Sequence, residues 1–436
     1  MAEIYSRTPN SNNSNNEYLC NPTGARDNNN ANNSNGVAPD YKECLSLIQV
    51  DEQNSLNAVL PCREISTIPA TKRENNDADA GRAGLPTHRF PVVKATNGIP
   101  FVFADLIEAT RLCKRGVIWK DSVAGFVKNR MFRCDYLMRD LEAGTYKLAP
   151  YTCFKVHEPK ERDIVATNMQ DRVVQRAICN TSFYHDMTKG FIYDNWACQV
   201  GKGTTACRKR MKQLMVKAYR LYGKDVCFLK VDIKSYFGTT PHDVAKEAIR
   251  KRCKNKWVAD YACMIVDSFN DVGLVDIGIG LGSQLSQLIE LAVLDSLDHQ
   301  IKDRDGVPCY MRYMDDIILF GRKEELRERR IEIEEHLKKI GLSVSKKKTF
   351  IGTVKQSLHF LGFAYSYTDT GKILMKPLKG KENKEKRKLR KQLNLLPIEK
   401  VDNAFVSWKA NASQGTDFSV IRRMNRYYSI IRRAYA

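Results

Sequence analysis

The stretch 309–321, "CYMRYMDDIILFG", places two adjacent aspartates, Asp315 and Asp316, between two apolar and aromatic runs. Apolar runs joined by a short polar pair predict a strand, a tight turn and a second strand. An ionised carboxylate flanked by apolar strands is unfavourable unless a partner compensates its charge, and a metal ion does this well. The pair therefore indicates either a metal site or a hairpin turn that faces water.

A second stretch, "VCFLKVDIKSYFGTTP" (226–241), ends an apolar run at Asp232 and continues into an aromatic pair, Tyr236 and Phe237. Two strands that each present a carboxylate at the same sheet edge can hold two Mg²⁺ ions roughly 3.5–4 Å apart. Such a pair of ions activates an attacking hydroxyl and stabilises the leaving phosphate. The two stretches together predict nucleotidyl transfer with two Mg²⁺ ions as the cofactor.

The composition indicates a folded protein with a polyanionic partner. Of 436 residues, 43% are hydrophobic, and 71 Lys+Arg against 50 Asp+Glu give a formal charge of +21. An excess of this size favours nucleic acid over the alternative of a basic surface that binds nothing. We find no apolar run of membrane-span length and no signal-peptide pattern, so we expect a cytoplasmic protein. The 13 cysteines form no Cys-x-x-Cys pair, which predicts reduced thiols in core positions.

Changes in residue composition divide the chain into distinct segments. Residues 1–37 are rich in Asn, and the polar, Pro-containing character continues to about 95, so this part is expected to be disordered. The segment "RRIEIEEHLKKIGLSVSKKKT" (329–349) predicts a helix, a stop at Gly341 and a strand directly after it. From Lys376 onward, sixteen Lys/Arg stand against five Asp/Glu, which predicts a strongly basic helical end piece.

Five motifs in order resemble those of reverse transcriptases over roughly 100–436. "KVDIKSYF", "YMDD" and "LHFLGF" are similar to the palm motifs, "EPKERDIVATNMQDRVVQRAI" to the fingers segment, and "GFIYDNWACQVGKGTTA" to the block after it. The resemblance implies an α+β right-hand polymerase fold whose palm is an antiparallel sheet carrying the catalytic aspartates. It implies fingers at 96–225, a palm at 226–375 with a fingers-linked insertion at about 241–277, and a basic helical thumb at 376–436.

The resemblance also implies roles for single residues at the metal site. Asp232, Asp315 and Asp316 would be the catalytic, metal-binding aspartates, with the backbone carbonyl of Ile233 as an extra ligand. One lysine of the run 346–348, for which we select Lys348, would protonate the departing pyrophosphate.

Further residues are implied at the nucleotide and the nucleic acid. Phe237 would block a ribose 2′-hydroxyl and so favour dNTPs, and Lys160 and Arg162 would clamp the incoming triphosphate, a task suited to a guanidinium. Contacts to nucleic acid are expected from Arg172, Tyr313, Lys388, Arg390 and Lys391.

The stretch "GIGLGSQLSQLIELAVLDSLDH" (278–299) indicates which group of reverse transcriptases the chain resembles. Group II intron and retroviral enzymes have Gln before the glycine and Ser-Pro after it, whereas here Leu281 precedes Gly282 and Ser286-Gln287 follows. This form is similar to reverse transcriptases of diversity-generating retroelements, within the group II intron-like bacterial enzymes. Replacing an amide donor by Leu281 removes a hydrogen bond that could test base-pair geometry, so low fidelity is expected of a pocket with Leu281, Gly282 and Gln287.

The retroelement resemblance implies a bacterial or phage-encoded polymerase that makes error-prone, adenine-mutagenised cDNA from a template-repeat RNA. Its expected partners are the template RNA, the RNA/cDNA duplex, dNTPs and a small basic accessory protein. Two alternatives stay open: an antiphage defence enzyme that copies a dedicated noncoding RNA, and a non-catalytic RNA-binding protein on the same fold.

The Asn-rich segment 1–37 carries a hypothesis at the level of nucleic acid. Asn is encoded only by AAC and AAT, so the frame is rich in adenines at the first two codon positions. Randomising these adenines reaches most amino-acid types and makes no stop codon. The segment is therefore either a translated copy of an adenine-mutagenised template repeat or a solvated flexible tail.

Overall fold

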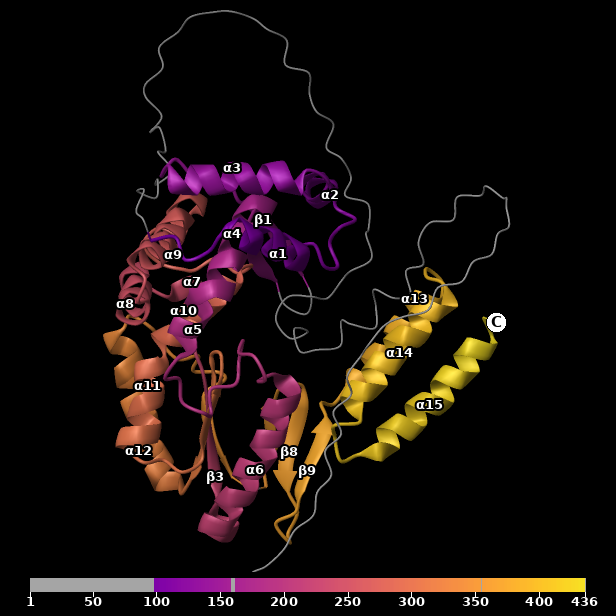
Figure 1. Ribbon diagram of the computed structural model, residues 1–436. Coiled ribbons are helices and arrows are strands. Elements are labelled where there is room, and N and C mark those ends of the chain that lie inside the picture. Colours follow the sequence, from indigo (N-terminus) through magenta and orange to yellow (C-terminus); the bar gives the residue numbers. More distant parts are fainter. Residues whose placement is uncertain (1–97, 158–160, 354, 436) are drawn as a thin grey trace, which may run out of the picture. The chain divides into compact units, whose positions relative to one another are not determined.

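A four-stranded antiparallel sheet with the strand order β4-β5-β3-β6 carries the predicted aspartates. The computed structural model describes residues 98–157, 161–353 and 355–435 (Figure 1). The strands are β3 (Cys227–Asp232), β4 (Tyr310–Tyr313), β5 (Asp316–Gly321) and β6 (Phe350–Thr353). The predicted strand, turn and strand over 309–321 are confirmed, and so is the position of Asp232 at a strand end.

The two faces of this sheet enter different hydrophobic cores because side chains alternate along a strand. Leu229 and Val231 of β3 share one core with helix α12 (Lys323–Lys339). Phe228 points to the opposite face and packs with helix α6 (Thr204–Tyr222). Figure 1 shows α12 and α6 on either side of β3. Lys230 and Asp232 have the same parity as Phe228 and therefore belong to the α6 face.

Most helices that precede or follow β3 in the sequence contribute to the α12-side core, whereas α6 belongs to the core on the other face. The helices that precede β3 are α1 (Phe103–Cys113), α2 (Asp121–Lys128), α3 (Arg130–Glu142), α4 (Met169–Ile178), η1 (Cys179–Phe183), α5 (Tyr184–Thr188), α6 and η2 (Gly223–Asp225). They are interrupted by the hairpin of β1 (Thr152–Val156) and β2 (Arg162–Ala166). The helices between β3 and β4 are α7 (Tyr236–Thr239), α8 (His242–Arg252), α9 (Lys256–Ser268), η3 (Phe269–Val272), α10 (Gln284–Val293), α11 (Asp295–His299) and η4 (Gln300–Arg304).

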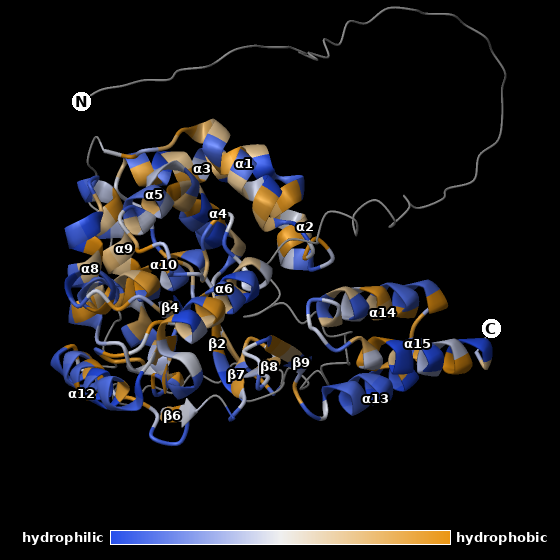
Figure 2. Cartoon of the chain, turned by 90° about the horizontal axis from the view of Figure 1, so that it is seen from below, coloured by the Kyte–Doolittle hydropathy of each residue, from blue (hydrophilic) through white to orange (hydrophobic). Residues whose placement is uncertain are grey.

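The C-terminal part consists of a small sheet and three helices. The sheet has the order β7-β8-β9, with β7 (Leu358–Phe360), β8 (Phe363–Tyr367) and β9 (Ile373–Pro377). The helices α13 (Lys381–Leu393), α14 (Ile398–Ala412) and α15 (Phe418–Arg433) have a core of their own, and α13 is largely hydrophilic (Figure 2). The helical end piece therefore begins at Lys381 and not at Lys376, because β9 pairs with β8 as far as Pro377.

One local prediction is wrong. Helix α12 stops before Gly341, which has φ +75°, but no regular strand follows over 342–349. Val344 forms only an isolated bridge with Ile233, and the N–H of Lys348 bonds to the carbonyl of Ser345 in a turn. Pairing resumes only at Phe350, so the turn interrupts the expected strand.

Three further expectations concern the N-terminal segment, membrane helices and the cysteines. Residues 1–95, and with them the hypothesis on 1–37, lie outside the described residues. In the described ranges, we find no helix with the length and apolar character that crossing a membrane requires. The described cysteines are free, and most are buried or half-buried, although Cys153 is exposed.

Candidate active site

The three predicted aspartates lie at one end of the β3–β5 pair. Asp232, the last residue of β3, stands opposite Asp316, the first residue of β5, and Asp315 lies in the turn between β4 and β5. The pKa of Asp315 is raised to about 6, mainly by burial and in addition by the neighbouring carboxylates of Asp316 and Asp232. The turn thus concentrates negative charge where it is poorly solvated, which favours a cation at this place.

A buried ion pair stabilises the turn that carries Asp315. Met314 has φ +55°, a strained conformation for a residue other than glycine, and its carbonyl accepts a hydrogen bond from Arg312 Nη1 at 3.0 Å. Arg312 and Asp298 are fully buried and form an ion pair at 2.5 Å. Breaking such a pair is strongly destabilising because it leaves an uncompensated charge inside the protein. Arg312 and Asp298 therefore hold the aspartate turn in place, a role that the sequence analysis missed.

Two lysines pair with the aspartates. Lys348 Nζ lies 2.5 Å from Asp232 Oδ2, next to the group of Asp232, Asp315 and Asp316 that we call the carboxylate edge. Its role as the proton donor to pyrophosphate stays a prediction. Lys230 Nζ lies 3.0 Å from Asp316 Oδ1 and donates a hydrogen bond to the carbonyl of His359 at 3.1 Å. Lys230 was not predicted, although its place two residues before Asp232 puts both side chains on one face of β3.

The carboxylate oxygens of the three aspartates fit the ligand preference of Mg²⁺. Among the described residues, no three His, Cys, Asp or Glu side chains are drawn together into a ready metal site. However, Asp316 Oδ1 is buried and, although close to Lys230, accepts no hydrogen bond of good geometry. Carboxylate oxygens are the ligands that Mg²⁺ prefers, and Asp232, Asp315 and Asp316 supply them at one edge. Ile233 is buried beside them, and its role as a carbonyl ligand stays a prediction.

The predicted nucleotide pocket is assembled from segments far apart in the sequence. The N–H of Ile279 donates to the carbonyl of Phe237 in α7 at 2.6 Å, and the N–H of Val165 in β2 donates to the carbonyl of Leu281 at 3.1 Å. The segment 279–282, which we call the pocket wall, therefore connects α7 with β2. That Phe237, Leu281 and Gly282 line a nucleotide pocket stays a prediction.

Glycines allow the pocket wall to approach the β1–β2 hairpin. A Cβ on Gly280 would lie 2.5 Å from Phe269 Cε1 and 2.9 Å from Val165 Cβ. Gly282 has φ +149°, and a Cβ there would lie 2.7 Å from the carbonyl oxygen of Val165. These glycines are needed because any side chain would push the wall away from β2. Gln287 follows in α10, where it is half-buried.

The remaining predicted residues are spread over other elements. Arg162 is the exposed first residue of β2, and Lys160 lies outside the described residues. The guanidinium of Arg172 in α4 donates to the carbonyl of Thr167 at 3.4 Å, and the ring of Tyr313 stands edge-on to Phe360. Three exposed cations follow one another on α13, namely Lys388, Arg390 and Lys391. Their contacts to nucleotide and nucleic acid stay predictions.

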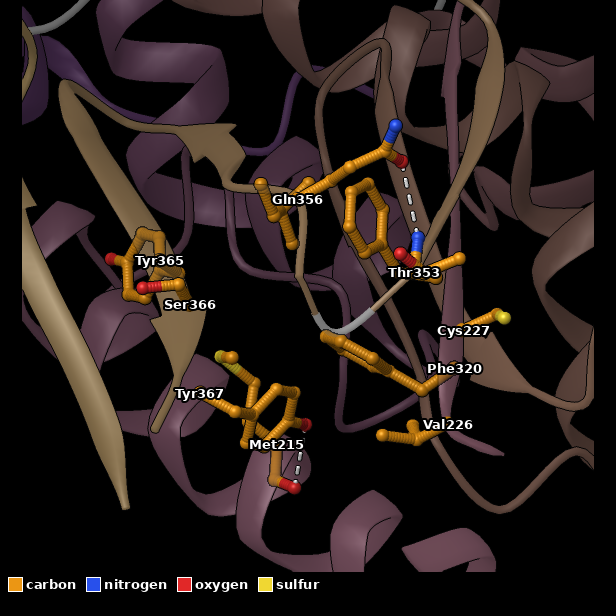
Figure 3. A pocket seen from close by; sticks show the side chains of 11 residues that line it. Met215, Val226, Cys227, Phe320, Thr353, Gln356, Tyr365, Ser366 and Tyr367 are labelled. Carbon is orange, nitrogen blue, oxygen red and sulfur yellow. Dashed lines mark hydrogen bonds between the residues drawn. The ribbon is translucent and has the colours of Figure 1, made fainter. Parts of the chain in front are cut away.

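A small cavity of the palm lies away from this chemistry. Its lining includes Met215, Cys227 and Tyr365, and Tyr367 Oη donates to the carbonyl of Met215 at its edge (Figure 3). Cys227 begins β3 and Asp232 ends it, so about 16 Å of strand separates the cavity from the aspartates. We therefore assign the cavity no part in catalysis.

The fold and the carboxylate edge define the class of the protein: a right-hand polymerase whose palm sheet presents aspartates at one edge. The family described as reverse transcriptase (RNA-dependent DNA polymerase) matches residues 155–365. This match covers the carboxylate edge, α7 and the pocket wall. Residues 155–365 are therefore similar to reverse transcriptases, that is, to RNA-dependent DNA polymerases.

Individual proteins are similar to the chain at low identity. The putative COX1/OXI3 intron 1 protein of Saccharomyces cerevisiae is 21% identical over 342 residues, which cover 63% of this chain and 39% of the yeast protein. Among solved structures, apo telomerase from Candida tropicalis is 12% identical, covers 50% of this chain and 47% of its own, and has a TM-score of 0.38. Telomerase from Candida albicans, in complex with a fragment of telomeric RNA, is 12% identical, with coverages of 70% and 59% and a TM-score of 0.41.

Proposed function

We propose that the chain is an RNA-directed DNA polymerase that extends a primer with dNTPs on a template RNA. The observation that carries the proposal is the register of β3 and β5, which sets Asp232 opposite Asp316 with Asp315 in the adjoining turn. Asp232, Asp315 and Asp316 would hold two Mg²⁺ ions, which when bound activate the primer hydroxyl and stabilise the leaving pyrophosphate. Lys348, whose Nζ lies 2.5 Å from Asp232 Oδ2, would donate the proton that the leaving pyrophosphate needs.

We further propose that the enzyme is of the diversity-generating retroelement type and makes errors opposite template adenines. The support is the pocket wall, where Leu281 offers no side-chain hydrogen bond and is attached to β2 through its backbone carbonyl. A pocket of this kind discriminates by shape alone, which allows mispairs that an amide donor would reject. The template RNA and the small basic accessory protein are the partners that this function would require.

The test is primer extension by the purified chain on an RNA template with Mg²⁺ and dNTPs, followed by sequencing of the cDNA. We expect full-length cDNA with substitutions concentrated at template adenines, both with and without the candidate accessory protein added. Absence of any extension would overturn the polymerase assignment. Extension with errors spread evenly over the four bases would overturn the retroelement type and favour the antiphage enzyme.

A further inference from the structure

Glu290 is a fully buried acid in the core next to the pocket wall. It lies on α10, and burial raises the pKa of its carboxyl to about 8. Glu290 Oε1 is buried without a hydrogen-bond partner among the described residues, whereas Oε2 meets the hydroxyl of Thr240 at 2.9 Å. A leucine would fill the same space without an unsatisfied oxygen. The acid therefore needs an explanation other than the stability of the core.

The partners of Glu290 stand at the two ends of helix α7. Tyr236 is the first residue of α7, and its hydroxyl donates to the backbone carbonyl of Glu290 at 2.5 Å. Thr240 follows the last residue of α7, and its hydroxyl meets both Glu290 Oε2 and, at 3.0 Å, the carbonyl of Tyr236. Thr240 is fully buried and Tyr236 nearly so. Two hydrogen bonds to one residue of α10 thus hold both ends of α7.

Helix α7 cannot hold its own position. It has four residues, and a helix of this length has no stability without tertiary contacts. The residue before it, Ser235, has φ +48°, so the chain enters the helix through a strained turn. The orientation of α7 therefore depends on its contacts with α10 and with the pocket wall.

The two helices that Glu290 connects each carry a residue of the predicted nucleotide pocket. Phe237, which would exclude a ribose 2′-hydroxyl, is on α7. Gln287 lies three residues before Glu290, on the neighbouring turn of α10. A change in the Glu290 bonds would alter the separation of Phe237 and Gln287 without touching either side chain.

We propose that Glu290 is a positioning residue that holds α7 against α10 and thereby sets the width of the nucleotide pocket. Discrimination of dNTPs against rNTPs then depends on the bond between Glu290 and Thr240, which a hydroxyl and either a carboxyl or a carboxamide can make. The inference rests on the polymerase function proposed above and extends it to the selection of the sugar.

The experiment compares Glu290→Gln, Glu290→Leu and Thr240→Val in single-nucleotide primer extension with dNTPs and rNTPs. We expect Glu290→Leu and Thr240→Val each to lower the ratio of the two kcat/KM values about tenfold. Glu290→Gln should keep the ratio within about twofold because its carboxamide still bonds to Thr240. The double variant, Glu290→Leu with Thr240→Val, should be no worse than either single change, since both remove the same bond.

A matched control separates positioning from general loss of stability. Tyr146→Phe removes a buried tyrosine hydroxyl that donates to Asp171 in α4 and has no part in the bonds between α7 and α10. We expect a lower melting temperature for this variant with an unchanged dNTP to rNTP ratio. If Glu290→Leu does not fold, Thr240→Val, which keeps the shape of the side chain, decides the question.

The outcomes distinguish this inference from the proposed function. No extension by the unchanged protein would overturn both. Extension by the unchanged protein, with a ratio in Thr240→Val within twofold of it, would overturn the positioning role and leave the polymerase function intact. A loss in Glu290→Gln as large as in Glu290→Leu would also overturn it, because the hydrogen bond would then not be the cause.

Discussion

In the proposed function the carboxylate edge and the pocket wall serve the same reaction, but they are built differently. The edge consists of charged side chains on paired strands, where Asp232 and Asp316 face each other and two lysines pair with them. The pocket wall consists of backbone hydrogen bonds and glycines, through which the segment 279–282 meets α7 and β2. The edge supplies charge, and the wall supplies shape.

This difference predicts that the carboxylate edge governs the rate of the reaction and that the pocket wall governs the choice of nucleotide. Removing a charge from the edge should stop the reaction, because no neighbouring group replaces a carboxylate as a metal ligand. Changing the wall should alter which nucleotide is accepted, because shape acts on the difference between competing substrates.

The largest effect is expected at the edge. Asp315→Asn together with Asp316→Asn should abolish Mg²⁺-dependent dNTP incorporation on an RNA template, because neutral amides cannot hold the metal pair. Binding of the RNA should change by less than about twofold, since affinity comes from dispersed cations. Primer extension and a filter-binding titration measure the two properties.

A surface carboxylate serves as the control for the edge. Asp267→Asn removes an acid of α9 that pairs with Lys246 at 2.6 Å, and it should leave incorporation unchanged. Polymerisation by a well-folded Asp315→Asn, Asp316→Asn variant would contradict the assignment of the edge.

A large structural effect is expected at Gly280 of the wall. Gly280→Ala places a Cβ against Phe269 and Val165, and overpacking of this kind costs about 1–3 kcal/mol. The matched change Gly125→Ala adds a Cβ in helix α2, where nothing lies within 4 Å, so it should stabilise the protein by about 0.5–1 kcal/mol. Urea unfolding of both variants checks the difference, and equal stabilities would mean that the wall does not pack on Phe269.

The sequence predicts the edge better than the wall, for physical reasons. Strand alternation and strand ends are local, so the positions of Asp232, Asp315 and Asp316 could be predicted. The bond between Val165 and Leu281 joins residues from distant parts of the chain and depends on the packing of β2. The strand expected after Gly341 failed because a local turn at Ser345 outweighed the apolar pattern.

Buried polar partners were missed for a related reason. Glu290 and Arg312 stand in otherwise apolar runs, where a charged residue can be an exposed exception or a member of a buried network. Only the fold distinguishes the two cases, because it brings Asp298 to Arg312 and Thr240 to Glu290.

A moderate effect on fidelity is expected from the wall itself. Leu281→Gln, alone or with Gln287→Pro, should lower misincorporation opposite template adenine about tenfold, which corresponds to about 1.4 kcal/mol of discrimination. The reason is that an amide restores a donor that can test the geometry of the new base pair. Sequencing of cDNA measures the change, and an unchanged adenine spectrum would move the cause to the template or to an accessory protein.

A smaller effect, on stability, is expected from the charge state of Glu290. Burial raises its pKa from 4.5 to about 8, so between these values the unfolded chain loses a proton that the folded chain keeps. Stability contributed by this group is therefore present at low pH and declines as pH rises through that window. Glu290→Gln removes the decline, and its melting temperature relative to the unchanged protein should rise by several degrees from pH 5 to pH 8. Parallel melting curves over this range would contradict a neutral, buried Glu290.

The smallest effect is expected far from both regions, in the Asn-rich segment. Deleting residues 2–40, which lie outside the described residues, should leave the primer-extension rate of the purified protein within about twofold, because so polar a segment has little apolar area to contribute to a core. If the segment matters as a template copy, its role is at the level of RNA, and the DNA flanking the gene should carry a near-copy that differs mainly at adenines. A rate that falls strongly on deletion would show that the polypeptide itself takes part in catalysis. A flanking copy with differences spread evenly over the four bases, or no copy at all, would end the template hypothesis, and the low-discrimination wall would then belong to a polymerase used for defence.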